Sequence, residues 1–225
     1  MRLELCGEAL ELDPAGLLHW PERGLVVVAD LHLEKGSAFA RRGLMLPPYD
    51  THATLLRLEA VLARLRPRTV VSLGDSFHDR RGAELLEPEL ARQVRRLTGS
   101  VEWVWVRGNH DPDPPAGLGG RAVPELSVAG LLFRHAPCGE AGEVAGHLHP
   151  KARLVGTRLR LSRPCYVSDG LRLVLPAFGS YTGGLDVMHP AIAGLFPTGF
   201  AAMLLGTERV FRIPHDRLEA WQGVG

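Results

Sequence analysis

Short apolar runs alternate with amphipathic segments over the first half of the chain. The runs Leu25–Ala29, Thr69–Leu73 and Trp103–Val106 are typical of strands buried on both faces of a parallel sheet. Between them, apolar residues recur every three or four positions over 52–65 and again over 88–97, which predicts two helices. The first half therefore indicates a strand–helix–strand–helix–strand order.

The second half is mostly short apolar or alternating runs separated by Gly, Pro or Asp-Gly turns, which predicts strands. The expected strands are 131–133, 153–155, 158–161, 166–167, 171–175, 201–205 and 210–213, and two more lie near 3–5 and 10–12. The chain contains no evident repeat, low-complexity tract or linker. We therefore predict one α/β domain over 1–225, with a boundary near the Pro-rich loop 112–120 as the less favoured alternative.

Composition narrows the function classes. Lys and Arg number 26 against 25 Asp and Glu, a formal net charge of +1, so no global charge excess points to nucleic acid or to an anionic membrane. The three cysteines are far apart and form no Cys-x-x-Cys pair, which favours neither a disulfide framework nor a structural zinc site. Carboxylates interrupt the N-terminal segment and no apolar run is long enough to cross a bilayer. We expect a cytoplasmic protein without membrane association.

A polar cluster follows each of the three buried strands of the first half. Asp30 and His32 follow the first, Asp75 the second, and Asn109 with His110 the third. Ligands bind at the carboxyl ends of strands in open α/β sheets, so we expect these side chains to meet at one edge. The spacing of Asp30 and His32 places both on one side of an extended segment.

Further imidazoles follow strands of the second half. His135 stands alone after an apolar run, and His147 and His149 form another alternating pair. With Asp30, His32, Asp75 and Asn109 they make seven N and O donors, which suit two metal ions about 3.5–4 Å apart that share a carboxylate. Mixed carboxylate and imidazole donors favour Mn²⁺, Fe or Zn²⁺ over Ca²⁺ or Mg²⁺, and we expect Mn²⁺.

These blocks resemble the calcineurin-like metallophosphoesterases, whose motifs run D-x-H, G-D, G-N-H-[DE], a lone His and G-H-x-H in this order. The resemblance implies a four-layer α/β/β/α sandwich with a di-metal cleft at the strand ends. It also implies the ligand sets: Asp30, His32, Asp75 and His149 for one metal ion, and Asp75, Asn109, His135 and His147 for the other.

Longer strings at 29–36, 41–43, 46–50, 74–79 and 178–184 resemble a narrower bacterial group, the ligase-associated DNA endonucleases or phosphodiesterases called PdeM. That likeness implies DNA as substrate and a functional link to an ATP-dependent DNA ligase, a helicase and an exonuclease. One departure stands out. Where many relatives carry an acidic residue three positions after the metal-binding Asp75, this chain has His78 followed by Asp79.

Two metal ions predict phosphoester hydrolysis by in-line attack of water, because the cations lower the pKa of the water and neutralise charge on the phosphoryl oxygens. His110 is adjacent to Asn109 but is not counted as a ligand. We therefore expect it to donate a proton to the leaving alkoxide, with Asp111 as the residue that orients its ring.

Several polar residues near these loops are candidate substrate contacts, each with a structural alternative. They are His78, Asp79, Arg41, Arg42, Arg80, Arg81 and Tyr181. Most paired charges on loops are solvated surface, and the Gly-rich segment around Tyr181 also fits a turn between strands. Trp103 and Trp105 alternate with Val in a predicted central strand, which favours core packing over base stacking.

The residues together predict a metal-dependent phosphodiesterase, and the resemblance implies nuclease activity on DNA as the favoured function. A small-molecule phosphomonoesterase or nucleotide pyrophosphohydrolase would use the same centre. An inactive scaffold with this fold is the third alternative, which the intact set of catalytic positions disfavours. A basic strip across the cleft would favour a polymeric substrate, and a closed pocket a small one.

Overall fold

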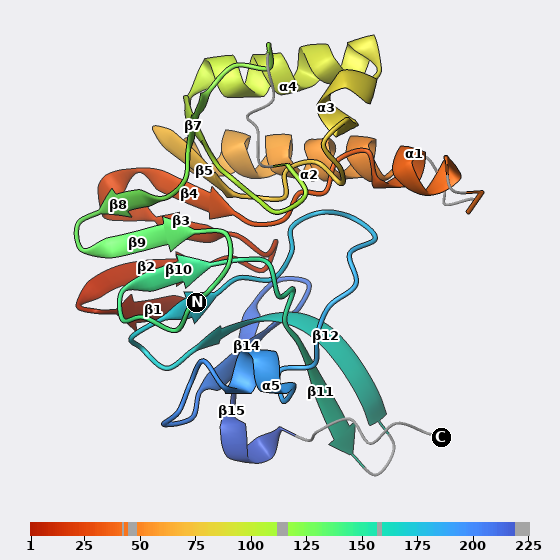
Figure 1. Cartoon of the computed structure of the whole chain (residues 1–225). Helices are drawn as coiled ribbons and strands as arrows, with labels where there is room; N and C mark the ends of the chain where they lie inside the picture. The colour runs from red at the N-terminus through yellow and green to blue at the C-terminus, as the bar shows by residue number, and fades with distance from the viewer. Residues whose placement is uncertain (42, 45–48, 112–116, 157–158, 219–225) are drawn as a thin grey trace.

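The computed structural model describes the chain except residues 42, 45–48, 112–116, 157–158 and 219–225. Two β-sheets lie face to face, and helices cover the outer face of the first sheet (Figure 1). Arg42, one of the expected substrate contacts, lies outside the described residues.

The first sheet has the order β1-β2-β3-β4-β5-β6-β7. Its strands are Arg2–Leu5, Glu8–Leu12, Leu18–Trp20, Leu25–Val28, Thr69–Leu73, Glu102–Val106 and Arg121–Val123. β4 to β7 pair in parallel and β1 to β4 pair antiparallel. The three strands predicted to be buried are therefore adjacent and parallel, so their carboxyl ends share one edge.

The second sheet has the order β15-β14-β12-β13-β10-β9-β8, and β11 pairs with β12 outside this path. Its strands, from β8 to β15, are Leu126–Val128, Leu131–Arg134, Glu143–Ala145, Lys151–Gly156, Leu159–Ser168, Leu173–Val174, Ala201–Leu205 and Val210–Pro214. β9, β10 and β13 run parallel, which aligns the ends that carry His135 and His147.

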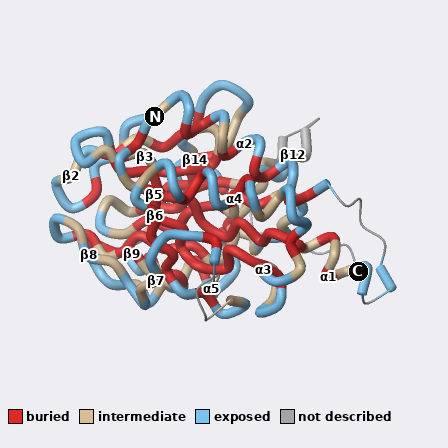
Figure 2. Tube along the Cα trace, turned by 90° about the horizontal axis from the view of Figure 1, so that it is seen from above, coloured by how far each residue is buried: buried red, intermediate tan, exposed pale blue. Residues whose placement is uncertain are grey.

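The core between the sheets follows from alternation along each strand. Val27 of β4 and Tyr166 of β12 face this core, whereas Val26 packs under the helices and Val167 lies on the outer face of the second sheet. Buried residues run through the middle of the molecule and exposed ones line its rim (Figure 2). Trp103 and Trp105 are 3% and 4% exposed in the layer beneath the helices, which confirms their expected core role.

The helical layer accounts for the amphipathic segments. The α-helices are α1 Lys35–Ala40, α2 Asp50–Leu65, α3 Gly82–Leu85, α4 Pro88–Ser100 and α5 Pro190–Ala193, and the 3₁₀ turns are Pro21–Arg23 and His215–Arg217. α2 and α4 bury leucines and valines against the first sheet, as predicted. On the far side, α5 packs with Phe196 and Phe200 over the second sheet. The four layers of the expected α/β/β/α sandwich are present, and the fourth is the thinnest.

The structure differs from the expected elements in two ways: two expected strands form one, and several short elements were not predicted. The separate strands expected at 158–161 and 166–167 belong to one strand, β12, which passes through Pro164. Pro164 is tolerated because it is the last β12 residue in register with β11, and the pairing with β14 starts only at Cys165. The other unpredicted elements, β3, β7, β8, β10, α1, α3 and α5, have three to six residues each.

Candidate metal centre

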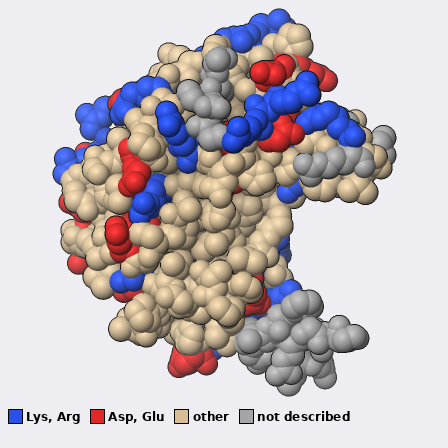
Figure 3. Space-filling model, viewed as in Figure 1, with Lys and Arg blue, Asp and Glu red and all other residues tan. Residues whose placement is uncertain are grey.

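Both sheets contribute to the site. Asp30 follows β4, Asp75 follows β5 and His110 follows β6, while His135 follows β9 and His147 and His149 follow β10. In Figure 1 the arrows of β9 and β10 point to the side from which α1 projects, and the space-filling view is hollowed on that side (Figure 3). The donors at the predicted edge of the first sheet therefore lie beside donors at the corresponding edge of the second sheet.

One group of donors consists of Asp30, His32 and His149. The ligand atoms of the three side chains lie within 4.8 Å of one another. Nε2 of His32 is 3.2 Å from Nε2 of His149, which lies 3.4 Å from Oδ1 of Asp30. Burial and the neighbouring His149 lower the pKa of His32 to about 3, so its imidazole is neutral and able to bind a cation.

The second group consists of Asp75, His135 and His147, whose ligand atoms also lie within 4.8 Å of one another. Nε2 of His135 is 3.4 Å from Oδ2 of Asp75 and 3.0 Å from Nδ1 of His147. Nδ1 of His135 donates to the carbonyl oxygen of Leu73 at 2.9 Å. That bond directs Nε2 of His135 into the centre, as metal-binding histidines require.

Electrostatics at Asp75 favour the carboxylate. Burial alone would raise its pKa, but the hydrogen bond and charge of His135 and the amide of His110 outweigh burial and hold the pKa well below its usual value. In the same contact the pKa of His135 rises to about 8 despite burial, because Asp75 and Asp30 favour its charged form. An anionic oxygen at this place suits a ligand shared by two cations.

The state of the donor atoms fits the binding of metal ions. Within the described part of the chain, Oδ1 of Asp30 and Nδ1 of His32 are buried without a hydrogen-bond partner, which is costly for polar atoms. Nε2 of His32 and Nε2 of His149 lie 3.2 Å apart, which places both within reach of a single cation. Four imidazoles and two carboxylates suit Mn²⁺, Fe or Zn²⁺.

The local backbone differs from the extended segment expected at Asp30 and His32. Both residues have positive φ angles, +53° and +44°, and His147 and His149 repeat the pattern at +69° and +45°. Such conformations are unfavourable for residues other than glycine. They are held by hydrogen bonds, among them His32 N–H to the Asp75 carbonyl and His147 N–H to Oδ2 of Asp30, both 2.9 Å. The side chains converge as expected, but by tight turns rather than by strand alternation.

His110 lies at the exposed side of the centre, with 48% of its side chain accessible and Nε2 3.8 Å from Oδ2 of Asp75. The structure pairs the ring of His110 with a main-chain carbonyl rather than with Asp111, the residue expected to orient it. Oδ2 of Asp111 accepts the amides of Ser76 and Phe77 at 2.8 and 3.1 Å, while Nδ1 of His110 lies 2.8 Å from the carbonyl oxygen of His78. Burial raises the pKa of Asp111 to about 7. The carboxylate therefore supports the loop after Asp75 rather than the ring of His110.

The remaining expected residues lie around this centre in different settings. Asn109 is exposed beside His110, and its role as a ligand stays a prediction. Nη2 of Arg41 pairs with Oδ2 of Asp79 at 2.6 Å, and Arg80 and Arg81 are exposed in the same loop region.

Tyr181 is 47% exposed. Its segment is fixed beside the centre, because the amides of Phe178 and Gly179 donate to the carbonyls of Ala29 and Asp30. The segment lies between β13 and α5, so it is not the turn between two strands that its glycines also suggested.

Sequence reasoning missed the residues that hold the loop after His32. Glu34 is 5% exposed and accepts from the hydroxyls of Ser37 and Thr51 at 2.6 and 3.1 Å, while its own amide donates to Thr51. Asp50 accepts from the amide of Gly36. The signal in the sequence was Asp50-Thr51 at the start of a predicted helix, which resembles an ordinary helix start.

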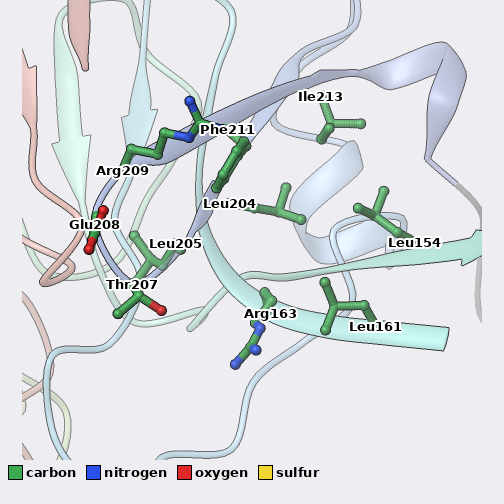
Figure 4. A pocket seen from close by; sticks show the side chains of 11 residues that line it. Leu154, Leu161, Arg163, Leu204, Leu205, Thr207, Glu208, Arg209, Phe211 and Ile213 are labelled. Atoms are coloured by element: carbon green, nitrogen blue, oxygen red, sulfur yellow. The ribbon is translucent and has the colours of Figure 1, made fainter. Parts of the chain in front are cut away.

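A separate cavity of about 610 Å³ lies on the second sheet, away from the donors. Leucine side chains of β11, β12 and β14 line it together with Phe211 and Ile213, and Arg209 and Glu208 lie at its rim (Figure 4). The lining is mostly apolar, and its polar side chains are those of Arg163, Thr207, Glu208 and Arg209. In the view of Figure 3, Lys and Arg gather over the helical layer that borders the hollowed side.

Comparison with known proteins agrees with this geometry. The family of calcineurin-like phosphoesterases matches residues 25–186. Among solved structures, the nuclease MPE of Pseudomonas putida is 31% identical, with a TM-score of 0.72 over 95% of this chain and 99% of that one.

The phosphoesterase YfcE of E. coli is a distant neighbour, 14% identical with a TM-score of 0.43 over 85% of this chain and 98% of its own. A comparison with curated protein sequences gave no significant match.

Among the described helices, none has the length and apolar character to cross a membrane. The family match spans the three donor-bearing turns of the first sheet as well as His135, His147 and His149. The chain therefore belongs to the calcineurin-like phosphoesterase family and is a metal-dependent phosphoesterase.

Proposed function

We propose that this phosphoesterase hydrolyses phosphodiester bonds in DNA as an endonuclease, with residues 1–225 acting as one domain. The observation that carries the proposal is the likeness to the Pseudomonas putida nuclease, which extends over 95% of this chain rather than over the metal-binding turns alone. The family gives the reaction class, and this neighbour favours a nucleic acid over a small phosphate ester.

Asp30, His32, Asp75 and His149 would hold one divalent ion, and Asp75, Asn109, His135 and His147 the other, with Mn²⁺ as the expected metal. When bound, two such ions supply an activated water and neutralise charge on the phosphoryl group. The protein contributes the fixed positions of these donors. Asp30 and Asp75 are 0% and 2% exposed, so little water would compete with the cations for their carboxylates.

His110 would protonate the leaving oxygen. Its Nε2 is on the side of the ring near Asp75, and its 48% exposure leaves room for a substrate on that side. A protonated imidazole beside a leaving alkoxide contributes about 10²–10⁴ in rate in comparable enzymes. No nucleophilic side chain is needed for this reaction.

The surroundings of the centre favour a chain-like substrate. The molecule is hollowed on the side to which β9 and β10 point, and the helical layer beside the hollow carries Lys and Arg together with Asp and Glu (Figure 1, Figure 3). Arg80 and Arg81 are exposed and would contact phosphates that flank the scissile bond. Arg41 is engaged by Asp79, so its expected substrate contact would require that pair to open.

We also propose, from the likeness to ligase-associated endonucleases, a functional link to an ATP-dependent DNA ligase, a helicase and an exonuclease. The reducing cytoplasm suits this role because the three cysteines are unpaired.

The test compares Mn²⁺-dependent hydrolysis of bis-p-nitrophenyl phosphate, p-nitrophenyl phosphate and labelled single-stranded DNA by the wild type, His110→Ala and Asp75→Asn. We expect diester and DNA cleavage by the wild type and a large loss in both variants. Activity on the monoester alone would make the protein a small-molecule phosphatase. No activity on any of the three with two bound ions would contradict the proposal and favour the scaffold.

A further inference from the structure

The two lysines of the chain extend from the turns that carry the first donor group. The sequence has 26 Lys and Arg residues, and only Lys35 and Lys151 are lysines. Lys35 begins α1 shortly after His32, and Lys151 begins β11 shortly after His149. Because Nε2 of His32 and Nε2 of His149 are 3.2 Å apart, these two turns meet at one place. The lysines therefore come from both sheets to the same side of the metal centre.

Each ammonium group is positioned by its surroundings and keeps hydrogen-bond donors for a further partner. Nζ of Lys151 donates to the carbonyl oxygen of Thr182 at 3.3 Å, and a Cβ on Gly184 would lie 3.0 Å from Cγ of this lysine. Nζ of Lys35 lies 5.8 Å from the ring centroid of Phe39. Since an ammonium group has three donors, both lysines have donors available for an anion.

Among the described residues, neither lysine forms an ion pair, because the ion pairs there are made by arginines and histidines. Burial lowers the pKa of Lys35, Asp50 raises it, and the charge of Lys151 lowers it further. The two ammonium groups therefore act on each other. Asp50 is 4% exposed and accepts from the amide of Gly36, so it serves the loop. Like charges this close are unfavourable until an anion joins them.

The anion that fits carries charge beyond the phosphoryl group that reacts. Metal ions at the centre would already neutralise charge on that group. In a polynucleotide the neighbouring phosphodiesters are negatively charged as well, and contacts with them fix the position of the strand. A lysine ammonium is a compact charge on a flexible stem, which suits such a phosphate without demanding one orientation.

We propose that Lys35 and Lys151 form a subsite for the phosphodiester that flanks the scissile one on the side of the first donor group. The inference rests on the proposed action on DNA. It adds a contact made by both sheets to those expected from Arg80 and Arg81 in the loop after β5.

The first test measures binding in Mn²⁺ by the anisotropy of a fluorescent oligothymidylate, in a His110→Ala background that slows cleavage. It compares Lys35→Gln with Lys151→Gln, the corresponding double change to Arg, and the background alone. Each phosphate contact of a single strand contributes about 0.7 to the slope of log Kd against log salt. The Gln pair should lose about 1.4 of this slope and bind about 25-fold more weakly at about 0.1 M salt. The Arg pair should keep most of both.

The matched control is Arg209→Gln with Arg212→Gln, which removes the same charge at β15, the edge strand on the far side of the second sheet from β8. It should keep the slope of the background protein. A Gln pair that also keeps this slope would overturn the inference. So would a Gln pair that loses thermal stability but no affinity, because Lys35 would then only balance Asp50.

The second test observes the lysines directly. Reductive methylation with ¹³C-formaldehyde labels Lys35, Lys151 and the N-terminal amine, and single Gln variants assign the two lysine signals. In the Zn²⁺-loaded His110→Ala protein, both lysine signals should shift when oligothymidylate is added. The N-terminal signal should stay, because that amine is bonded to the carbonyl of Leu12 on the first sheet. Lysine signals that stay at saturating DNA would overturn the subsite.

The third test separates the subsite from the proposed function. In the otherwise wild-type protein, the Gln pair should lower kcat/KM for DNA about tenfold more than kcat/KM for bis-p-nitrophenyl phosphate, which has no flanking phosphate. Equal losses would overturn the inference and place the lysines at the reacting group. A wild type that hydrolyses the diester but neither binds nor cleaves DNA would contradict the proposed function, and the inference with it. Failure of the inference alone appears only in the lysine variants and signals.

Discussion

At the scale of single residues, Asp75 has contacts on both sides of the centre. Oδ2 lies 3.4 Å from Nε2 of His135, Oδ1 accepts the amide of His110 at 2.9 Å, and the charge of Asp75 also acts on His32 in the other donor group. Asp30 also reaches both groups, since its Oδ1 lies 3.4 Å from Nε2 of His149 and 3.8 Å from Nδ1 of His135. The two carboxylates therefore connect the groups electrostatically.

We expect Asp75→Asn to reduce bound Mn²⁺ from two ions per chain to less than one, because a neutral amide leaves the imidazoles without their shared anion. Metal content after dialysis, measured by mass spectrometry of the ions, checks this. Asp216→Asn, at an exposed aspartate in the 3₁₀ turn near the C-terminal end of the described chain, is the control and should keep two. Two ions retained by Asp75→Asn would show that Asp75 is not shared.

The cysteines differ in reactivity for a physical reason. Cys165 is 0% exposed, and burial raises the pKa of its thiol, whereas Cys6 and Cys138 are exposed. Because the thiolate is the reactive form, Cys165 should be inert in the folded protein. We expect an aromatic disulfide reagent to titrate two thiols per chain in buffer and three in denaturant. Three rapid equivalents in buffer would contradict the packing around β12.

At the scale of elements, the turn after β6 approaches the turn after β5 so closely that only glycine is allowed. A Cβ on Gly108 would lie 2.1 Å from the amide nitrogen of Asp75 and 2.6 Å from Oδ1 of Asp111. Gly99 in α4 is the opposite case, since a Cβ there would have no neighbour within 4 Å. An alanine at Gly108 therefore tests the effect of crowding, and an alanine at Gly99 tests the effect of helix propensity.

Gly108→Ala should destabilise the protein by about 1–3 kcal/mol through overpacking and weaken metal binding, because Asp75 must move. Gly99→Ala should stabilise it by about 0.5–1 kcal/mol. Urea denaturation and metal titration of both variants check this pair. Equal stability of the two variants would mean that the turns after β5 and β6 have room to separate.

The elements also show what the sequence could predict. Asp30 follows its apolar run directly, and Asp75 and Asn109 follow theirs after one and two residues, so their placement at one edge of a parallel sheet followed from the pattern. The short strands β3, β7, β8 and β10 have three residues each, which is too few to show a periodic pattern of apolar residues.

The positive φ angles of His32 and His149 and the contact of His110 with the carbonyl of His78 depend on tertiary hydrogen bonds. No local pattern encodes them. The conclusion that the turns converge was therefore available from the sequence, and the way in which they converge was not.

At the scale of the whole molecule, the metal centre joins the two sheets. Asp30 and Asp75 extend from the first sheet, and His135 and His149 from the second. Each donor group contains members from both: His149 lies with Asp30, and His135 lies with Asp75. Bound ions would thus act as cross-links between the sheets, in addition to the apolar core that already joins them.

Metal removal should therefore lower the stability of the entire fold. An ion that binds only the folded state adds about 2.7 kcal/mol when its free concentration is 100 times its Kd. For a chain of this size that corresponds to roughly 5–10 °C in the thermal midpoint for each site. We expect the midpoint in excess Mn²⁺ to exceed that in chelator by at least this amount, with a single transition in both conditions because the sheets share one core.

Calorimetry of the wild type and of His149→Ala separates the two sites. Loss of His149 removes a donor of the first group only, so part of the Mn²⁺-dependent shift should remain, attributable to Asp75, His135 and His147. A shift abolished entirely by His149→Ala would mean that the ions bind only as a pair. A midpoint unaffected by chelator in the wild type would contradict the view that the centre connects the two sheets, because ions held by both must stabilise their contact.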